Sequence, residues 1–191
     1  MKTWKQFLKE GISGTPTILP EKFTGIIQLK PVDGSFLRDL QAQIQQQFPD
    51  QKPITKLHIT LLHQAIPKKV FSKTLVGQND VLLRGDKALK QIFKDGTVAT
   101  IQLPSIDFGT VGMKSEGDRT STFIRIESQR VLKKYLHDIL FVAGLDISEI
   151  SLVSEAEPRE AGRIFHISLT NLTGNPGDSL ANINGGTEIN I

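Results

Sequence analysis

The sequence has no cysteine among its 191 residues and no long hydrophobic run. The missing cysteine excludes disulfide bonds, thiolate catalysis, iron–sulfur clusters and cysteine-rich zinc sites. A zinc site would then need several converging histidines and carboxylates. Because no His-Glu-x-x-His or comparable spacing is present, we expect no metal and no cofactor. The apolar runs, such as residues 54–62 and 139–145, fall short of the roughly 18 to 20 residues that cross a bilayer, so we expect no membrane partner.

Net positive charge is small and concentrated at the start of the chain. The formal charge is +3, and the first ten residues carry three lysines against Glu10, which leaves 20 basic and 19 acidic residues in the remainder. A nearly neutral body argues against nonspecific wrapping of long nucleic acid, because that binding depends on many phosphate contacts. A local pocket for one phosphate is still allowed.

Hydrophobic periodicity predicts alternating strands and helices over residues 22–174, followed by a loosely ordered tail, rich in Gly, Asn and Asp, at residues 175–191. The expected strands cover about residues 22–30, 54–64, 97–108, 121–127, 147–154 and 163–172, and the expected helices cover about residues 37–48, 87–93 and 128–143. The polar residues 112–120 would separate two strands of a long hairpin. This alternation favours one layered α/β or α+β domain, preceded by a linker at residues 11–21.

Two of the four histidines occupy matching frames. His58 is followed by Ile, Thr60 and Leu, and His166 is followed by Ile, Ser168 and Leu. Side chains alternate between the two faces of a strand, so each frame presents an imidazole and a hydroxyl on one face and aliphatic side chains on the other. One such frame usually marks only a solvated sheet face. Its duplication, 108 residues apart, is the most informative feature of the sequence.

With these two frames the sequence resembles the two-histidine (2H) phosphoesterase superfamily, whose members carry two His-x-Thr/Ser motifs about one lobe apart on a bilobal sheet. The likeness runs in order over about residues 22–172, and residues 163–165 are similar to the basic and aromatic lead-in often seen at the second motif. The proline that commonly precedes each motif histidine is missing, and Ser168 replaces the commoner threonine while keeping its hydroxyl. The resemblance implies an α+β, bilobal fold with antiparallel-rich sheets and helices packed on their outer faces.

The resemblance further implies a phosphodiesterase that acts on 2′,3′-cyclic phosphate ends of RNA, on 2′-5′-linked oligonucleotides or on cyclic oligonucleotides. Cleavage needs one proton removed from the attacking oxygen and one delivered to the leaving oxygen, and imidazole can do either near neutral pH. His58 and His166 would be the base and the acid, in an order that the sequence leaves open. Thr60 and Ser168 would hydrogen-bond the non-bridging phosphate oxygens. No metal is required for this chemistry.

Three basic residues are candidates for binding the substrate phosphate. Lys56 shares the face of His58, Arg125 lies inside an expected strand, and Arg163 precedes the second frame. The alternatives are ordinary exposed positions and, for Arg125, a cross-strand ion pair.

The two remaining histidines are interpreted as structural. His63 lies five residues after His58, so strand parity places it on the opposite face, as a polar residue at the end of the strand. His137 belongs to the expected helix at residues 128–143, at a surface or half-buried position.

The first ten residues form a short amphipathic segment, because Trp4, Phe7 and Leu8 recur at helical spacing before Gly11. One interpretation is a frayed terminal helix that docks on the domain. Residues 1–10 also resemble the capsid-targeting propeptide of internal proteins of T-even-like tailed bacteriophages, which implies processing by a prohead protease after Glu10. Such a virion internal protein would be delivered from the phage capsid into the host cytoplasm.

The sequence therefore predicts a monomeric phosphodiesterase whose substrate is an RNA terminus or a small cyclic or 2′-5′-linked oligonucleotide, serving phage counter-defence or RNA processing. The alternative is a noncatalytic protein, either a module that binds a nucleotide or a capsid-internal structural protein of a phage.

Overall fold

The three-dimensional structure is a computed structural model, which describes residues 18–21, 27–31, 33–63, 79–155 and 164–191 of the chain. Outside the described residues lie the expected propeptide, the first part of the expected linker, and Arg163.

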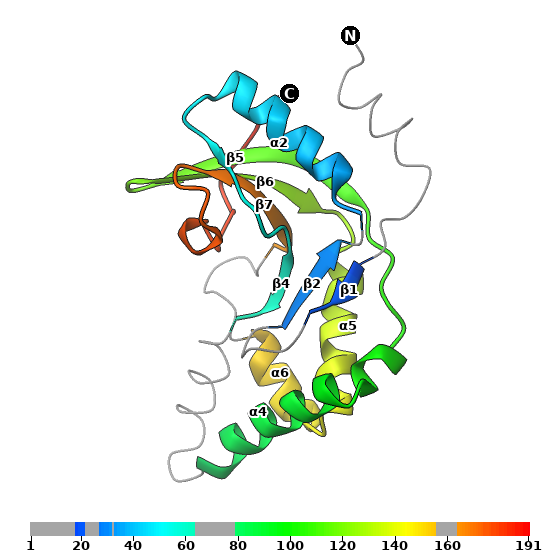
Figure 1. The fold of residues 1–191 in the computed structure, drawn as a ribbon. Helices are drawn as coiled ribbons and strands as arrows, with labels where there is room; N and C mark the ends of the chain where they lie inside the picture. Colours follow the sequence, from blue (N-terminus) through cyan, green and yellow to red (C-terminus); the bar gives the residue numbers. More distant parts are fainter. Residues whose placement is uncertain (1–17, 22–26, 32, 64–78, 156–163) are drawn as a thin grey trace.

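One eight-stranded sheet organises the fold, which is α+β (Figure 1). The strands are β1 (Ile18–Pro20), β2 (Ile27–Pro31), β3 (Lys52–Pro53), β4 (Ile59–Leu62), β5 (Phe108–Glu116), β6 (Arg119–Ile126), β7 (His166–Asn171) and β8 (Thr187–Glu188). The helices are α2 (Ser35–Gln47), α4 (Asn79–Lys94), α5 (Gln129–Val142) and α6 (Ile147–Glu155), with short 3-10 turns η1 (Thr97–Thr100) and η2 (Pro176–Asp178). The strand order is β1-β2-β4-β7-β6-β5-β8, with β3 paired to β7, and every ladder between these described strands is antiparallel. This order places β4 and β7, the strands of the two histidine frames, side by side in the middle of the sheet.

The helices bury one face of these central strands. Helix α2 contacts β7, and helix α5 contacts β4. Ile59 and Leu61 of β4 and Ile167 and Leu169 of β7 are buried in one hydrophobic cluster together with residues of both helices. Each such buried side chain contributes about 1.5 to 3 kcal/mol to folding. The alternate residues of β4 and β7 are therefore directed to the opposite face of the sheet.

Helix α6 occupies residues 147–154, so the strand expected there is wrong. Asp146 and Glu149 form a reciprocal capping box. The Glu149 N–H donates to Asp146 Oδ1 at 2.8 Å, and the Asp146 N–H donates to Glu149 Oε2 at 2.9 Å. Both donors would lack partners at an uncapped helix start, so this local cap outweighs the apolar, strand-like pattern of the segment.

The expected strand at residues 97–108 is also wrong, because its first residues form the 3-10 turn η1. Asp95 Oδ1 accepts hydrogen bonds from the hydroxyl and from the backbone N–H of Thr97, at 2.6 and 2.9 Å. These bonds hold the pKa of Asp95 below its ordinary value. They also turn the chain at the point where the strand was expected to begin.

The expected hairpin is present with its second strand close to the predicted residues, but its first strand lies further along the chain. Strand β5 begins only at Phe108 and continues through residues that were expected to form a loop. The ladder closes at Glu116 and Arg119, so the turn consists of Gly117 and Asp118 alone. Gly117 adopts a φ of 62°, which glycine reaches without the strain that a Cβ would add.

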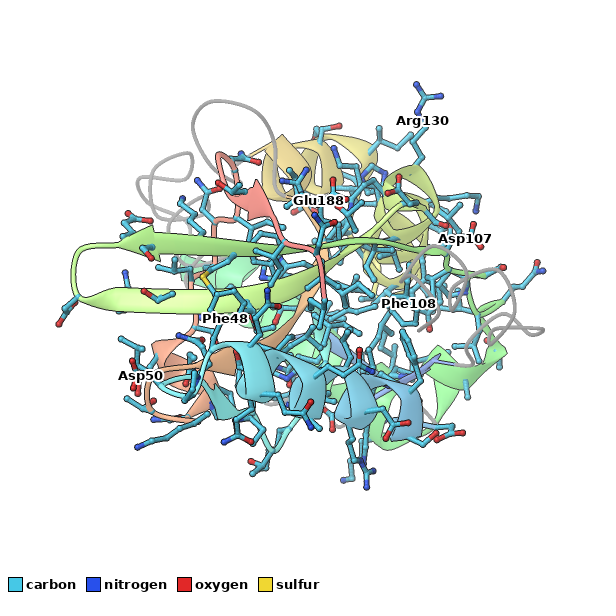
Figure 2. The ribbon with its side chains drawn as sticks, turned by 90° about the horizontal axis from the view of Figure 1, so that it is seen from above. Phe48, Asp50, Asp107, Phe108, Arg130 and Glu188 are labelled. Atoms are coloured by element: carbon cyan, nitrogen blue, oxygen red, sulfur yellow. The ribbon has the colours of Figure 1, made fainter. Side chains whose placement is uncertain are left out.

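The sheet extends past both expected ends of the domain. Residues 18–20, expected in the linker, form β1 and pair with β2. Residues 175–191, expected to be a loose tail, contain β8, which pairs with β5; Figure 2 shows Glu188 of β8 beside the long hairpin. Leu180 and Ile183 of this segment are buried, at 2% and 1% exposure. The expectation of a loose tail is therefore wrong.

Short polar side chains explain why the Asn- and Gly-rich tail takes a definite course. Asn171 Oδ1 accepts from the backbone N–H of Gly174, and Asn175 Oδ1 accepts from that of Gly177 at 3.0 Å. Such bonds replace backbone partners in tight turns. The composition therefore encodes turns in this segment.

Two glycines make room for the ring of Phe123, which is fully buried on β6. A Cβ at either Gly112 or Gly186 would lie 2.7 Å from this ring. We expect Gly112→Ala to lower the free energy of unfolding by about 1 to 3 kcal/mol, because the added methyl overpacks the core. Urea unfolding measures this. Gly177→Ala is the matched control, since its Cβ would come no closer than 3.5 Å to its neighbours, and equal losses in both variants would contradict the account.

Candidate active site

The two histidine frames meet because β4 and β7 are neighbours in an antiparallel ladder. The residues between histidine and hydroxyl in the two frames pair with each other. In that register His58 lies across from Ser168, and Thr60 lies across from His166. The two imidazoles therefore occupy diagonal positions, whose Cα atoms are roughly 7 to 8 Å apart in an antiparallel pair.

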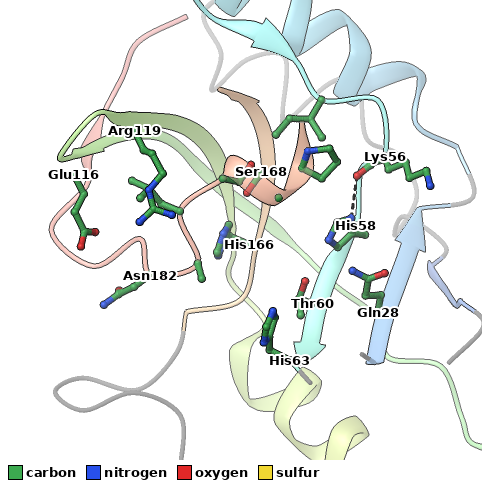
Figure 3. Close-up of a pocket in the computed structure, with 16 residues that line it drawn as sticks. Gln28, Lys56, His58, Thr60, His63, Glu116, Arg119, His166, Ser168 and Asn182 are labelled. Atoms are coloured by element: carbon green, nitrogen blue, oxygen red, sulfur yellow. Dashed lines mark hydrogen bonds between the residues drawn. The ribbon is translucent and has the colours of Figure 1, made fainter. Parts of the chain in front are cut away.

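These four side chains line one cavity of about 590 Å³ (Figure 3). Figure 3 shows Thr60 on β4, His58 directly before this strand, and His166 and Ser168 on β7, all facing the same space. Lys56 lines this cavity as well. Its volume lies within the range of ligand pockets, which is roughly 300 to 1,000 Å³. The structure thus brings together all four expected catalytic residues and one of the expected phosphate-binding residues.

The two imidazoles are held by identical hydrogen bonds. His58 Nδ1 lies 2.9 Å from the carbonyl oxygen of Lys56 (Figure 3). His166 Nδ1 likewise lies 2.9 Å from the carbonyl oxygen of Ile164, and in both cases the carbonyl belongs to the residue two positions before the ring. A carbonyl oxygen can only accept, so Nδ1 carries the proton in both rings. When the ring is neutral, its lone pair is then on Nε2, and when the ring is protonated, Nε2 carries the transferable proton.

Arg125 lies beside the second histidine but outside the cavity lining. It pairs with His166 in the ladder between β6 and β7. Its guanidinium stacks 5.9 Å from the ring centroid of Phe123 and donates to the carbonyl of Gly186 at 3.3 Å. Phe123 in turn meets the His166 ring edge-on, at 5.9 Å between centroids. Arg125 therefore lies beside His166 on the same face of the sheet, where its charge is directed to Phe123 and Gly186. Arg163 lies outside the described residues.

Two glutamines fasten the helices to the backbone of the site strands. Gln41 of α2 is buried, and its Nε2 donates to the carbonyls of Ile54 and Leu169, at 2.9 and 2.6 Å. Gln129 of α5 accepts from the N–H of Phe165 at 2.8 Å and donates to its carbonyl at 2.9 Å. Phe165 directly precedes the second motif histidine. Side-chain amides that bond both a donor and an acceptor of one residue fix its backbone orientation.

A third histidine, His63, lines the same cavity, which corrects the expectation from strand parity. Pairing with β2 passes from Thr60 to Leu62 on consecutive residues of β2, so Leu61 is the extra residue of a β-bulge. Leu61 and Leu62 are both buried, and the alternation is shifted by one from that point. His63 consequently returns to the face of His58. The two adjacent leucines are the sequence signal that could have indicated the bulge.

Sequence reasoning missed the far wall of the cavity, which the hairpin and the tail build together. The polar residues of this wall are Glu116, Arg119, Ser179 and Asn182. Lys114 connects its two parts, because Nζ lies 3.3 Å from Glu116 Oε2 and donates to the carbonyl of Asn182 at 3.0 Å. No local pattern could have found this wall, since its parts are distant in sequence.

The lining of the cavity is positively charged. Lys56 and Arg119 supply two cations, while Glu116, the one carboxylate among the described lining residues, is paired with Lys114. A concave surface with positive charge concentrates anionic ligands. Among the described residues, no group of three or more His, Cys, Asp or Glu side chains is arranged to hold a metal ion.

Comparison of the chain with protein-family models, with curated proteins and with solved structures finds no match. Within the described part of the chain, no helix is both long enough and apolar enough to span a bilayer.

The carbonyl bonds to Nδ1 predict the tautomer of both motif histidines. We expect neutral His58 and His166 to be protonated at Nδ1, which ¹⁵N chemical shifts and long-range ¹⁵N–¹H correlations of the imidazole rings measure directly. Variants that lack one histidine at a time assign the signals. A spectrum with the proton on Nε2 in either ring would contradict the hydrogen bonding described above.

Proposed function

We propose that the protein is a metal-independent phosphodiesterase of the two-histidine type. The single observation that carries the proposal is the convergence of His58 and His166, each with a hydroxyl partner, in one positively charged cavity. Its proposed substrates contain a 2′,3′-cyclic phosphate, a 2′-5′ linkage or a cyclic oligonucleotide. An anionic phosphodiester suits the charge of the cavity, and two imidazoles suffice for the proton transfers that its cleavage needs.

The proposed reaction uses the two rings as a base and an acid. On a 2′,3′-cyclic phosphate, Nε2 of the neutral ring takes a proton from water, and the water oxygen forms a bond to phosphorus. The bond from phosphorus to one ribose oxygen breaks, and Nε2–H of the protonated ring donates its proton to that oxygen. On an oligonucleotide, a ribose hydroxyl attacks in place of water and leaves a cyclic phosphate. The identical bonds at Nδ1 make each ring competent for either role.

Thr60 and Ser168 act on the phosphate itself in this proposal. Each hydroxyl lies across the ladder from the histidine of the other frame, so a phosphorus atom between the rings has a hydroxyl on either side. Donation to the non-bridging oxygens stabilises the charge that builds in the transition state. Lys56 adds a cation at the same cavity, which would orient the anion before reaction.

The arrangement of the chain around the site also fits the bilobal architecture of this superfamily. Strand β4 pairs with β2 on one side of the site, and β7 pairs with β6 on the other. In chain order, α2 lies between β2 and β4, and α5 lies between β6 and β7. Each of these helices carries one of the two glutamines, Gln41 or Gln129, that bond the backbone near the site. Such an approximate repeat is what two lobes with one motif each would give.

Removing either motif histidine tests the proposal. We expect His58→Ala and His166→Ala each to lower kcat by at least about 100-fold, because each deletes a proton-transfer group. The double variant should lose little more, since the two rings act as a unit. The measurement is product analysis on RNA with a 2′,3′-cyclic end and on 2′-5′-linked and cyclic oligonucleotides, with a chelator present.

His137→Ala is the matched control, because it removes an imidazole from α5, outside the cavity lining. It should retain wild-type activity. If the wild-type protein cleaves none of the three substrate classes but still binds nucleotides, the noncatalytic alternative replaces this proposal.

The proposal also predicts how the rate depends on pH. One ring must be neutral and the other protonated at the start of each turnover, so kcat/KM should fall on both the acidic and the alkaline side of an optimum. Steady-state rates over a pH series, with unfolding monitored in parallel, measure this. A rate that rises continuously with pH would mean that no histidine acts as the acid.

A further inference from the structure

A second cavity shares the lining residue Arg119 with the central one. Arg119 lines the central cavity and also this second cavity of about 300 Å³, between the tip of the hairpin and the chain that follows β7. The other residues that line it are Asp118, Thr120, Leu172, Thr173 and Asp178. The guanidinium thus belongs to the border between two spaces, of which the proposed reaction needs only the first.

The described residues leave the charge of Arg119 unpaired. Within the described residues its guanidinium makes neither an ion pair nor a hydrogen bond, whereas Lys114 of the same hairpin is bound to Glu116 and to the tail. Arginine binds a phosphate through two parallel N–H···O hydrogen bonds. Because both partners are charged, these bonds are stronger than hydrogen bonds between neutral groups. Arg119 is therefore suited to a phosphate at the border.

The second cavity has the chemistry of a site for a nucleoside and not for a phosphate. Asp118 and Asp178 repel anions, but their oxygens accept hydrogen bonds from amino groups of a base or from ribose hydroxyls. Thr173 is held in place by donating to Asp178 Oδ2 at 2.6 Å. Leu172, 38% exposed, offers an apolar surface against which a base can pack. A volume of about 300 Å³ is at the lower end for ligand pockets, which suits one nucleoside.

We propose that Arg119 binds the phosphate next to the scissile one and that the second cavity holds the nucleoside attached to it. This inference rests on the proposed function, because it takes the scissile phosphate to lie between the two histidines. It narrows the substrate class to oligonucleotides with at least two phosphates, linear or cyclic. A substrate with one phosphate would leave Arg119 without a partner.

The test compares substrates that differ by one nucleotide. The probes are dinucleoside monophosphates and trinucleoside diphosphates, each with 2′-5′ or 3′-5′ linkages. We expect Arg119→Ala to lower kcat/KM for the trinucleoside probe on the order of 10- to 100-fold, as for the loss of charged hydrogen bonds. The loss for the dinucleoside probe should be much smaller, because Arg119 acts on it only through the overall charge of the central cavity. Leu172→Ala, at an exposed position, should show the same selectivity with a smaller loss. Arg130→Ala is the control with equal charge, because Arg130 lies on α5, away from the hairpin tip (Figure 2), and lines neither cavity.

The outcomes separate the two proposals. Equal rates for both probe lengths in the wild-type protein, or an equal loss on both in Arg119→Ala, would overturn the second site while leaving the phosphodiesterase intact. If no probe is cleaved, titration calorimetry of the trinucleoside with the wild-type protein decides. Binding that Arg119→Ala weakens and Arg130→Ala does not would retain the second site without the enzyme. The absence of any binding would overturn both.

Discussion

The pairing of β4 with β7 is the constraint on which the site depends. One cross-strand pair, Ile59 with Ile167, sets the register, and that register decides which side chains share the cavity. A slip by one residue would bury both imidazoles in the core and expose the aliphatic side chains, so the hydrophobic cluster below the sheet protects the geometry above it. Helix α2 lies in the half of the chain that carries β4 but contacts β7, and helix α5 lies in the half that carries β7 but contacts β4. The free energy gained by burying these helices therefore also holds the two histidine frames together. Stability and site geometry are determined by the same contacts.

Both motif strands depart from regular alternation at the same place, three residues after the histidine. In β4 the extra residue is Leu61. In β7 the pairing with β6 passes over Leu169 in the same way. The first bulge turns His63 into the cavity. The second is followed by Asn171, whose Nδ2 donates to Ser179 Oγ of the cavity wall at 3.1 Å. Equivalent irregularities thus supply an additional imidazole on one side and the anchor of the tail on the other, in keeping with the frequent position of bulges next to functional sites.

How far the sequence predicts this structure depends on how local each feature is. The amphipathic helices and the two histidine frames follow from periodicity alone, and the structure brings His58, Thr60, His166 and Ser168 together. The spacing of Asp146 and Glu149 is a sequence signal for a helix start. The apolar pattern of residues 147–154 fits a strand and a helix equally, so periodicity alone does not identify the helix. The position of Arg119 in the cavity wall could not be predicted from the sequence, because this wall depends on the tail packing against a hairpin some sixty residues earlier in the chain. Arg125 shows the converse: its strand position was predicted correctly, but Phe123 and Gly186 direct its charge away from the cavity lining.

The two rings are held so alike that the central geometry does not distinguish acid from base. The distinction must then come from what surrounds each ring, and those surroundings differ. His166 has the Phe123 ring against it and Arg125 across the ladder, while His58 and the third imidazole, His63, lie at the two ends of β4. A phosphodiester between two equivalent imidazoles could bind in either direction, and only one direction presents the attacking oxygen to the base. In the proposed reaction the asymmetric wall of the hairpin and tail would set that direction, because it offers a guanidinium, from Arg119, where the other cation of the lining is the ammonium group of Lys56. On this proposal, residues outside the repeated motifs decide the direction of binding and thereby which histidine is the acid and which is the base.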